Sequence, residues 1–151
     1  MQEPLCNAYL DNAATTPVID EAIEAMNDVL RHAWGNPSSP HRVGYAAKDI
    51  LEQARATIAE CLDVDADEIY FTSGSTEANN LAVRGACMAR KGESRRIVTS
   101  SLEHASVTRS VRGMRREGWD VEHIEDVGGN FDMEQLRSAL QKPTTLITVM
   151  R

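Results

Sequence analysis

Two groups of residues in this sequence have the types and spacing that a chemical site needs. In the first, residues 73–76 (Ser-Gly-Ser-Thr), hydroxyl side chains surround one glycine just before a run of helix-forming residues. Backbone N–H groups at a helix start, the helix dipole and these hydroxyls can all bind one phosphate. In the second, Glu103-His104, an imidazole follows an apolar run. Together they suggest a site for a phosphate-bearing ligand beside a histidine.

The hydroxyl-rich loop by itself is a weak signal, because similar loops often serve only as turns and helix caps. No Gly-Lys-Ser or Gly-x-Gly-x-x-Gly pattern accompanies it, so the loop is neither a P-loop nor a dinucleotide-binding fingerprint. Glu77 and Glu103 resemble an acid–base pair, but Glu77 also suits the first turn of a helix. Asn79 and Asn80 fit helix-surface or packing positions. The other histidines lack metal-like spacing, so no metal site is predicted.

Composition limits the classes of function. The 151 residues carry a formal net charge of -7, which argues against a general nucleic-acid binder. The arginines between positions 84 and 116 are interpreted as an exposed surface. Three cysteines outside any Cys-x-x-Cys pair fit a reducing, cytoplasmic compartment, with Cys61 and Cys87 predicted as core thiols and Cys6 in an N-terminal arm. No apolar run reaches membrane-spanning length, and the start lacks the regions of a signal peptide.

The site must be positioned by the elements around it. After an arm, Thr16 and Pro17 favour a helix opening, and apolar spacing predicts a helix to about residue 32. A proline-rich loop at 34–41 precedes a second helix at 45–62. After Glu68 the pattern alternates between strands and helices, and loop residues Gly128-Gly129 precede a helix that Asp132 and Gln135 can cap reciprocally. The predicted elements are strands at 69–72, 96–100, 121–124 and 145–150 and helices at 76–90, 106–117 and 133–140.

Alternating strands and helices predict an α/β fold, a three-layer and mostly parallel sheet preceded by two N-terminal helices. Ligands of such sheets bind beyond the carboxyl ends of the strands, where residues 73–76 and His104 both fall. The domain boundary is predicted between residues 65 and 66. The last strand has no capping element after it, so the sheet is expected to be incomplete at its C-terminal end and prone to self-association.

The sequence resembles the cysteine desulfurases, pyridoxal-phosphate enzymes of the class V aminotransferase type. The motifs that carry the resemblance occur in order: 9–17 (YLDNAATTP), 35–41 (GNPSSPH), 72–82 (TSGSTEANNLA) and Glu103-His104. The likeness covers the whole chain, but the chain covers less than half of such an enzyme. It implies that 1–65 is an arm and helical segment. It also implies that 66–151 is the first half of the cofactor-binding large domain of a fold-type I enzyme.

The resemblance also implies residue roles. Thr76, with Gly74 and Ser75, would hold the phosphate of pyridoxal 5'-phosphate, and His104 would stack on the pyridine ring and move protons. Asn36 would lie near the substrate. The family usually has glycine or alanine at the Ser75 position, so this serine is a departure.

The chain lacks the rest of the implied machinery. The lysine that anchors the cofactor, the aspartate at its ring nitrogen, the arginine for the substrate carboxylate and the nucleophilic cysteine would all lie beyond Arg151. The lysines and cysteines present are assigned to none of these roles. The complete enzyme would convert L-cysteine to L-alanine, leave a persulfide for a sulfur-acceptor protein, and form a homodimer; this chain alone is expected to be inactive. The alternatives are a non-catalytic module that binds a phosphate-bearing ligand or a partner, and a fragment of another class V enzyme such as selenocysteine lyase.

Overall fold

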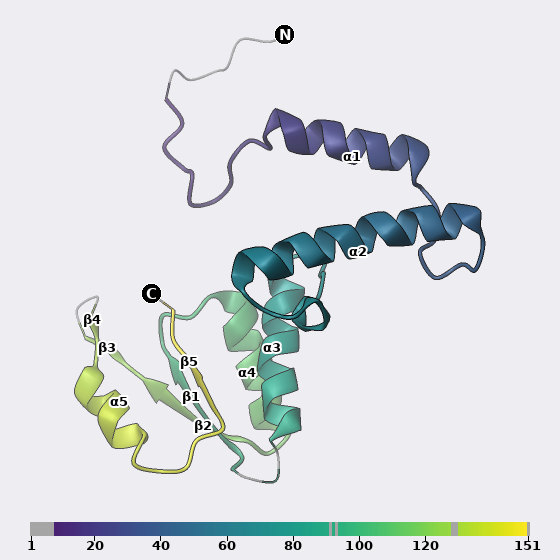
Figure 1. The fold of residues 1–151 in the computed structure, drawn as a ribbon. Helices are drawn as coiled ribbons and strands as arrows, with labels where there is room; N and C mark the ends of the chain where they lie inside the picture. The colour runs from purple at the N-terminus through teal and green to yellow at the C-terminus, as the bar shows by residue number, and fades with distance from the viewer. Residues whose placement is uncertain (1–7, 91, 93, 128–129, 151) are drawn as a thin grey trace. The chain divides into compact units, whose positions relative to one another are not determined.

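A computed structural model describes residues 8–90, 92, 94–127 and 130–150 (Figure 1). The described chain divides between Tyr70 and Phe71 into two compact units. The boundary expected from the sequence lies five residues earlier, between 65 and 66. None of the helices in the described ranges is both long enough and apolar enough to span a membrane.

The first unit contains two helices and a short 3-10 turn: α1 Asp20–His32, α2 Arg42–Leu62 and η1 Ala66–Glu68. The prediction that Thr16 and Pro17 open α1 is wrong, because residues 16–19 are not helical. Acidic Asp20 and Glu21 form the first turn instead, where they complement the helix dipole. The end of α1 at His32 agrees with the sequence.

The proline-rich loop is held against the start of α2. The helix begins at Arg42, three residues earlier than expected, because the His41 side chain caps it: Nδ1 accepts the Gly44 N–H at 3.2 Å. Glycine is required at position 44, since a Cβ there would lie 2.3 Å from Ser39 O and 2.7 Å from Asn36 O. The helix ends as predicted at Leu62, followed by Asp63 in the left-handed region at φ 54°.

The apolar faces predicted on these two helices are not covered. No residue of α1 is buried, and on α2 the buried residues are Gly44 and Ala59. Cys61 is exposed, so its assignment as a core thiol is wrong. An amphipathic pattern buries a face only where another layer packs on it, and the described part of this unit supplies no such layer. Cys6 lies outside the described residues.

The second unit is the predicted α/β sheet. Its elements are α3 Ser75–Ala89, β1 Arg96–Ser100, α4 Ala105–Arg116, β2 Asp120–Ile124, α5 Met133–Ala139 and β5 Leu146–Thr148. Within the described residues these strands form a three-stranded sheet in the order β2-β1-β5, with both pairs parallel. The parallel sheet is confirmed, and these six elements follow one another in the predicted order.

Helices cover both faces of the sheet, so the three-layer prediction also holds (Figure 1). On one face α3 and α4 lie side by side over a core that includes Cys87, Ile97 and Met114. On the other face α5 packs through Ala139 on Val98 and Ile124. Cys87 is fully buried, as expected, and this burial raises the pKa of its thiol.

The strand predicted at 69–72 is not formed. These residues pair with no described strand, and Tyr70 and Phe71 are 72% and 46% exposed. Apolar composition favours a strand, but a strand exists only where a neighbour accepts its hydrogen bonds, and neither edge strand of the described sheet, β2 or β5, pairs with these residues.

The segment before α5 also differs from the prediction. Two short antiparallel strands, β3 Asp126–Val127 and β4 Asn130–Phe131, occupy part of the predicted loop. Gly128 and Gly129 lie outside the described residues. Asp132 caps α5 as predicted, since its Oδ1 accepts the N–H groups of Glu134 and Gln135. The reciprocal bond is absent, because Gln135 Oε1 accepts the N–H of Glu125 instead, at 2.8 Å.

Candidate functional site

The start of α3 presents a group of hydrogen-bond donors without protein acceptors. Gly74 is the N-cap, in an extended conformation, and makes no side-chain cap. Backbone hydrogen bonding begins at Ala78, whose N–H donates to Gly74 O at 3.1 Å. Within the described part of the chain, the N–H groups of Ser75, Thr76 and Glu77 and the hydroxyls of Ser75 and Thr76 therefore lack a partner. A Cβ at Gly74 would meet no atom within 4 Å.

These donors suit an anion. Three N–H groups at the N-terminus of a long helix carry the positive end of its dipole, and two hydroxyls stand beside them. The open space at Gly74 leaves room for a phosphate to approach the backbone. The residues present thus fit the phosphate group of the cofactor that the sequence suggests.

Ser73 does not take part as expected. Its N–H and its hydroxyl both donate to Glu77 Oε2, at 2.7 and 2.6 Å. These two bonds, the hydroxyl bond first, lower the pKa of the Glu77 carboxyl below its ordinary value of 4.5. The Ser73 hydroxyl is thereby directed to a first-turn carboxylate, which leaves Ser75 and Thr76 as the hydroxyls that face solvent.

His104 is the N-cap of α4. Its side chain is exposed, and its Nδ1 accepts the Ser106 N–H at 3.2 Å and lies 2.8 Å from Ser106 Oγ. The cap explains why α4 starts at Ala105, one residue earlier than predicted. The turn before it is anchored to the sheet, because the hydroxyl of Thr148 on β5 donates to Glu103 Oε1 at 2.6 Å.

A hydrogen bond joins the two helix starts. Asn79, one turn into α3, donates from Nδ2 to Ser106 Oγ in the first turn of α4, at 2.8 Å. Because the N-caps Gly74 and His104 each precede these turns, the bond brings the donors of α3 and the imidazole of α4 to the same end of neighbouring helices. Ser106 and Thr148 were not identified from the sequence, and Asn79 was assigned there to a helix-surface or packing position. They are ordinary polar residues, and the only available signal was their place in the first turns or at a strand end.

Asn36 belongs to the first unit, whereas Gly74, Ser75, Thr76 and His104 belong to the second. Its Oδ1 accepts the Ser38 N–H at 2.9 Å, and its carbonyl oxygen accepts the Ser39 N–H at 3.0 Å. In the first unit Asn36 therefore shapes the proline-rich loop through its side chain and its backbone. The role near a substrate remains a prediction.

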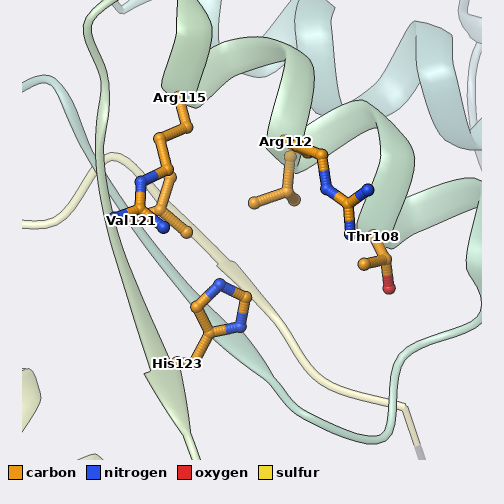
Figure 2. Close-up of a pocket in the computed structure, with 6 residues that line it drawn as sticks. Thr108, Arg112, Arg115, Val121 and His123 are labelled. Atoms are coloured by element: carbon orange, nitrogen blue, oxygen red, sulfur yellow. The ribbon is translucent and has the colours of Figure 1, made fainter.

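A separate small cavity of about 160 Å³ lies between α4 and β2 (Figure 2). Its lining is basic and partly apolar: Thr108, Val111, Arg112, Arg115, Val121 and His123. Arg112 and Arg115 belong to the arginines that were predicted to form an exposed surface, and both are exposed. None of the predicted site residues lines this cavity. Among the described residues no cluster of histidine, cysteine or carboxylate side chains has a metal-binding arrangement.

Comparison with known proteins places these features in a family. The aminotransferase class-V family matches residues 8–151. The NifS/IcsS protein homolog of Lactobacillus delbrueckii subsp. bulgaricus is 43% identical over 143 residues, which are 94% of this chain and 37% of that protein. The cysteine desulfurase IscS of Dictyoglomus turgidum is 40% identical over 143 residues, again 94% of this chain and 36% of the relative.

Solved structures agree with this assignment. A NifS-like protein superposes with a TM-score of 0.82 at 32% identity, over 92% of this chain and 38% of that one. A structure described as SspA in complex with cysteine gives a TM-score of 0.75 at 32% identity, over 91% and 40% of the two chains.

The chain therefore spans a little over a third of the length of these relatives. The resemblance to cysteine desulfurases that the motifs indicated is confirmed. With a family match over nearly its whole length and the same α/β fold as solved relatives, this chain belongs to the aminotransferase class-V family.

Proposed function

We propose that this chain forms the phosphate-binding part of the cofactor site of a pyridoxal-phosphate-dependent cysteine desulfurase. The observation that supports it is the set of unpartnered donors at the start of α3, with His104 at the start of the adjoining α4. The cysteine desulfurase activity is carried over from relatives such as the Dictyoglomus turgidum protein, which is named a cysteine desulfurase. The complete enzyme would convert L-cysteine to L-alanine and hold the sulfur as a persulfide for an acceptor protein. A relative solved with cysteine supports cysteine as the substrate.

Each residue of the site has a definite task in this proposal. The N–H groups of Ser75 and Thr76 and their hydroxyls bind the phosphate, and the α3 dipole adds to the attraction. His104 offers a flat ring for stacking and a nitrogen that holds a proton. Asn36 contributes near the substrate. Pyridoxal phosphate, when bound, supplies the electron sink that such chemistry on an amino acid needs.

Other tasks are not assigned to this chain. Lys48 is exposed on α2 and Lys142 is exposed in the turn after α5, and neither is assigned to anchor the cofactor. Cys87 is fully buried, and burial raises the pKa of its thiol, so it is a poor nucleophile. Covalent anchoring of the cofactor and sulfur transfer belong to residues outside it. The 151-residue chain is therefore expected to release no alanine from cysteine by itself. As a separate part of the proposal, the complete enzyme would be a homodimer.

A chimera tests the function directly. The matched 143-residue segment of the Dictyoglomus turgidum desulfurase would be replaced by the corresponding residues of this chain. The chimera is expected to show cofactor absorbance and to release alanine from cysteine. A folded chimera that binds phosphate ligands but does not release alanine would contradict the desulfurase assignment and favour a non-catalytic module. Alanine release by the 151-residue chain alone would contradict the division of tasks.

Two variants of the chimera test the phosphate site. Thr76→Val removes the hydroxyl but keeps the shape, and it is expected to weaken cofactor binding about tenfold, the loss typical of a hydrogen bond to a charged group. Thr57→Val is the matched control, because the Thr57 hydroxyl donates only to Gln53 O within α2. Equal cofactor dissociation constants for the two variants would contradict the assignment of Thr76.

A further inference from the structure

The ring of His104 is held through one of its two nitrogens. The backbone N–H of Ser106 donates to Nδ1 at 3.2 Å, and Ser106 Oγ lies 2.8 Å from the same atom. A backbone N–H is a donor only, so this bond favours the neutral ring that has an unprotonated Nδ1 and its proton on Nε2. At 3.2 Å the bond lies at the long end of the hydrogen-bond range, so the closer Ser106 hydroxyl adds a further preference that depends on the direction of its own proton.

Asn79 sets the direction of the hydroxyl between them. Its Nδ2 donates to Ser106 Oγ at 2.8 Å, so the hydroxyl accepts from Asn79 and has its own proton to donate. His104 Nδ1 lies 2.8 Å from this hydroxyl and can accept that proton. Ser106 is 4% exposed, so water does not compete for this hydroxyl. The bonds run in one direction, from Asn79 on α3 through Ser106 to the ring.

We propose that Ser106 and Asn79 are positioning residues that hold His104 in the tautomer with its proton on Nε2, so that Nε2 is the ring atom that presents a proton at the site. The chemical meaning of this inference depends on the proposed function, whereas the tautomer itself does not. Thr148 supports the same geometry from the sheet, since its bond to Glu103 fixes the turn that carries His104. The loop and the ring are thus held from α3, α4 and β5.

The tautomer is measurable in the 151-residue chain without cofactor. With ¹⁵N-labelled histidine, long-range ¹H–¹⁵N correlation at about pH 8, above the usual histidine range, distinguishes a protonated ring nitrogen from an unprotonated one. For His104 we expect an unprotonated Nδ1 and a protonated Nε2. His32 is the internal contrast, because its Nδ1 faces Asp28 Oδ1 at 2.8 Å and is expected to be protonated.

Variants test which groups set the tautomer. Ser106→Ala and Asn79→Ala are expected to move the two His104 ¹⁵N shifts toward each other, as a mixture of tautomers appears. Asn79→Asp should act in the same direction with almost no change of volume, because a carboxylate only accepts and draws the Ser106 proton away from the ring. Ser110→Ala is the matched control: Ser110 is a buried serine further along α4, 3% exposed, whose hydroxyl has no hydrogen-bond partner among the described residues.

The outcomes separate this inference from the proposed function. A protonated Nδ1 in the unmodified chain, or His104 shifts that stay unchanged in Ser106→Ala, Asn79→Ala and Asn79→Asp, would overturn the inference whatever the chimera does.

In an active chimera, Ser106→Ala is expected to lower kcat about tenfold with little change in KM, as for residues that orient a reactive histidine. Unchanged kcat there would overturn the positioning role. An inactive chimera with the expected tautomer would instead contradict the proposed function alone.

Discussion

At the scale of single residues, the start of α3 divides its donors between two uses. Ser73 donates to the carboxylate of Glu77, while Ser75 and Thr76 keep free hydroxyls. The carboxylate thus fixes the shape of the turn from within the protein and leaves the following donors available. Because Glu77 is fully exposed, this arrangement organises the loop rather than contributing much stability.

The Ser73–Glu77 contact predicts a pH dependence. The folded pKa of Glu77 lies below the unfolded value, so the bonds are present above pH 4.5 and are lost as the pH falls through the lowered folded pKa. Ser73→Ala removes the hydroxyl donor and keeps the N–H, so the Glu77 pKa is expected to rise partway toward 4.5. Carboxyl ¹³C NMR titration measures it. Ser75→Ala, which removes a hydroxyl without a partner, should leave the pKa unchanged; a rise in both variants would argue against the contact.

At the scale of elements, short connections hold helices and strands in register. In the first unit, Gly44 lets the proline-rich loop approach the start of α2. In the second unit, Arg96 at the start of β1 connects three segments: its guanidinium donates to Ala139 O at 2.7 Å and Thr144 Oγ1 at 2.9 Å and pairs with Glu122. The first connection depends on the absence of a side chain at Gly44, and the second depends on the single side chain of Arg96.

Gly44→Ala is expected to destabilise the first unit. The new Cβ would lie 2.3 Å from Ser39 O, so the loop or the helix start must shift, at a cost of about 1–3 kcal/mol. The control is Gly85→Ala, an exposed position inside α3 where a Cβ meets nothing within 4 Å. That variant should be stabilised by about 1 kcal/mol through helix propensity. Urea unfolding followed by far-ultraviolet circular dichroism compares them, and a neutral Gly44→Ala would contradict the close approach.

Arg96→Met is expected to lower the free energy of unfolding of the second unit by about 1–3 kcal/mol, because it removes the bonds to Ala139 O and Thr144 Oγ1 and the ion pair with Glu122. The Arg96 side chain is only 7% exposed, so water replaces the lost bonds poorly. Unfolding in urea, followed by the fluorescence of Trp119, measures the change. Arg137→Met, at an exposed arginine in the last turn of α5, is the control and should stay within about 0.5 kcal/mol of the unmodified chain.

At the scale of the whole molecule, the two units differ in how much they bury. The second has a layered core, whereas α1 in the first has no buried residue. Each unit contains one of the two tryptophans. Trp119 is 3% exposed with the Arg95 guanidinium 5.8 Å from its ring centre, and Trp34 is 72% exposed.

This difference predicts two unlike fluorescence signals. In Trp34→Phe, the remaining Trp119 should be quenched weakly by acrylamide and should report a cooperative unfolding transition. In Trp119→Phe, Trp34 should be quenched strongly and report a broad, early transition, because few apolar side chains are buried around it. Equal quenching of the two variants would show that the units do not differ in this way.

Local patterns were sufficient for much of the second unit. The strand β1 was predicted at its observed bounds, and both ends of α3, α4 and α5 lie within one residue of the prediction. Apolar periodicity and capping residues are properties of neighbouring positions, so they can be read without the fold. The same patterns failed at two places. At residues 16–19 the start of α1 depended on the acidic residues that follow, and at residues 69–72 a strand depended on a pairing partner elsewhere in the chain.

By itself, the sequence determined the order of the helices and sheet strands from α3 to β5, the parallel α/β class, the motifs of the family and the residues 74–76 and 104 as a candidate site. Only the tertiary structure decided that Asn79 reaches Ser106, that Ser106 turns His104 toward one tautomer, and that Ser73 serves Glu77 rather than a ligand. The physical reason is that a hydrogen bond depends on direction and distance within a few tenths of an ångström. Those quantities are set by how α3, α4 and the sheet pack, and no spacing along the chain contains them.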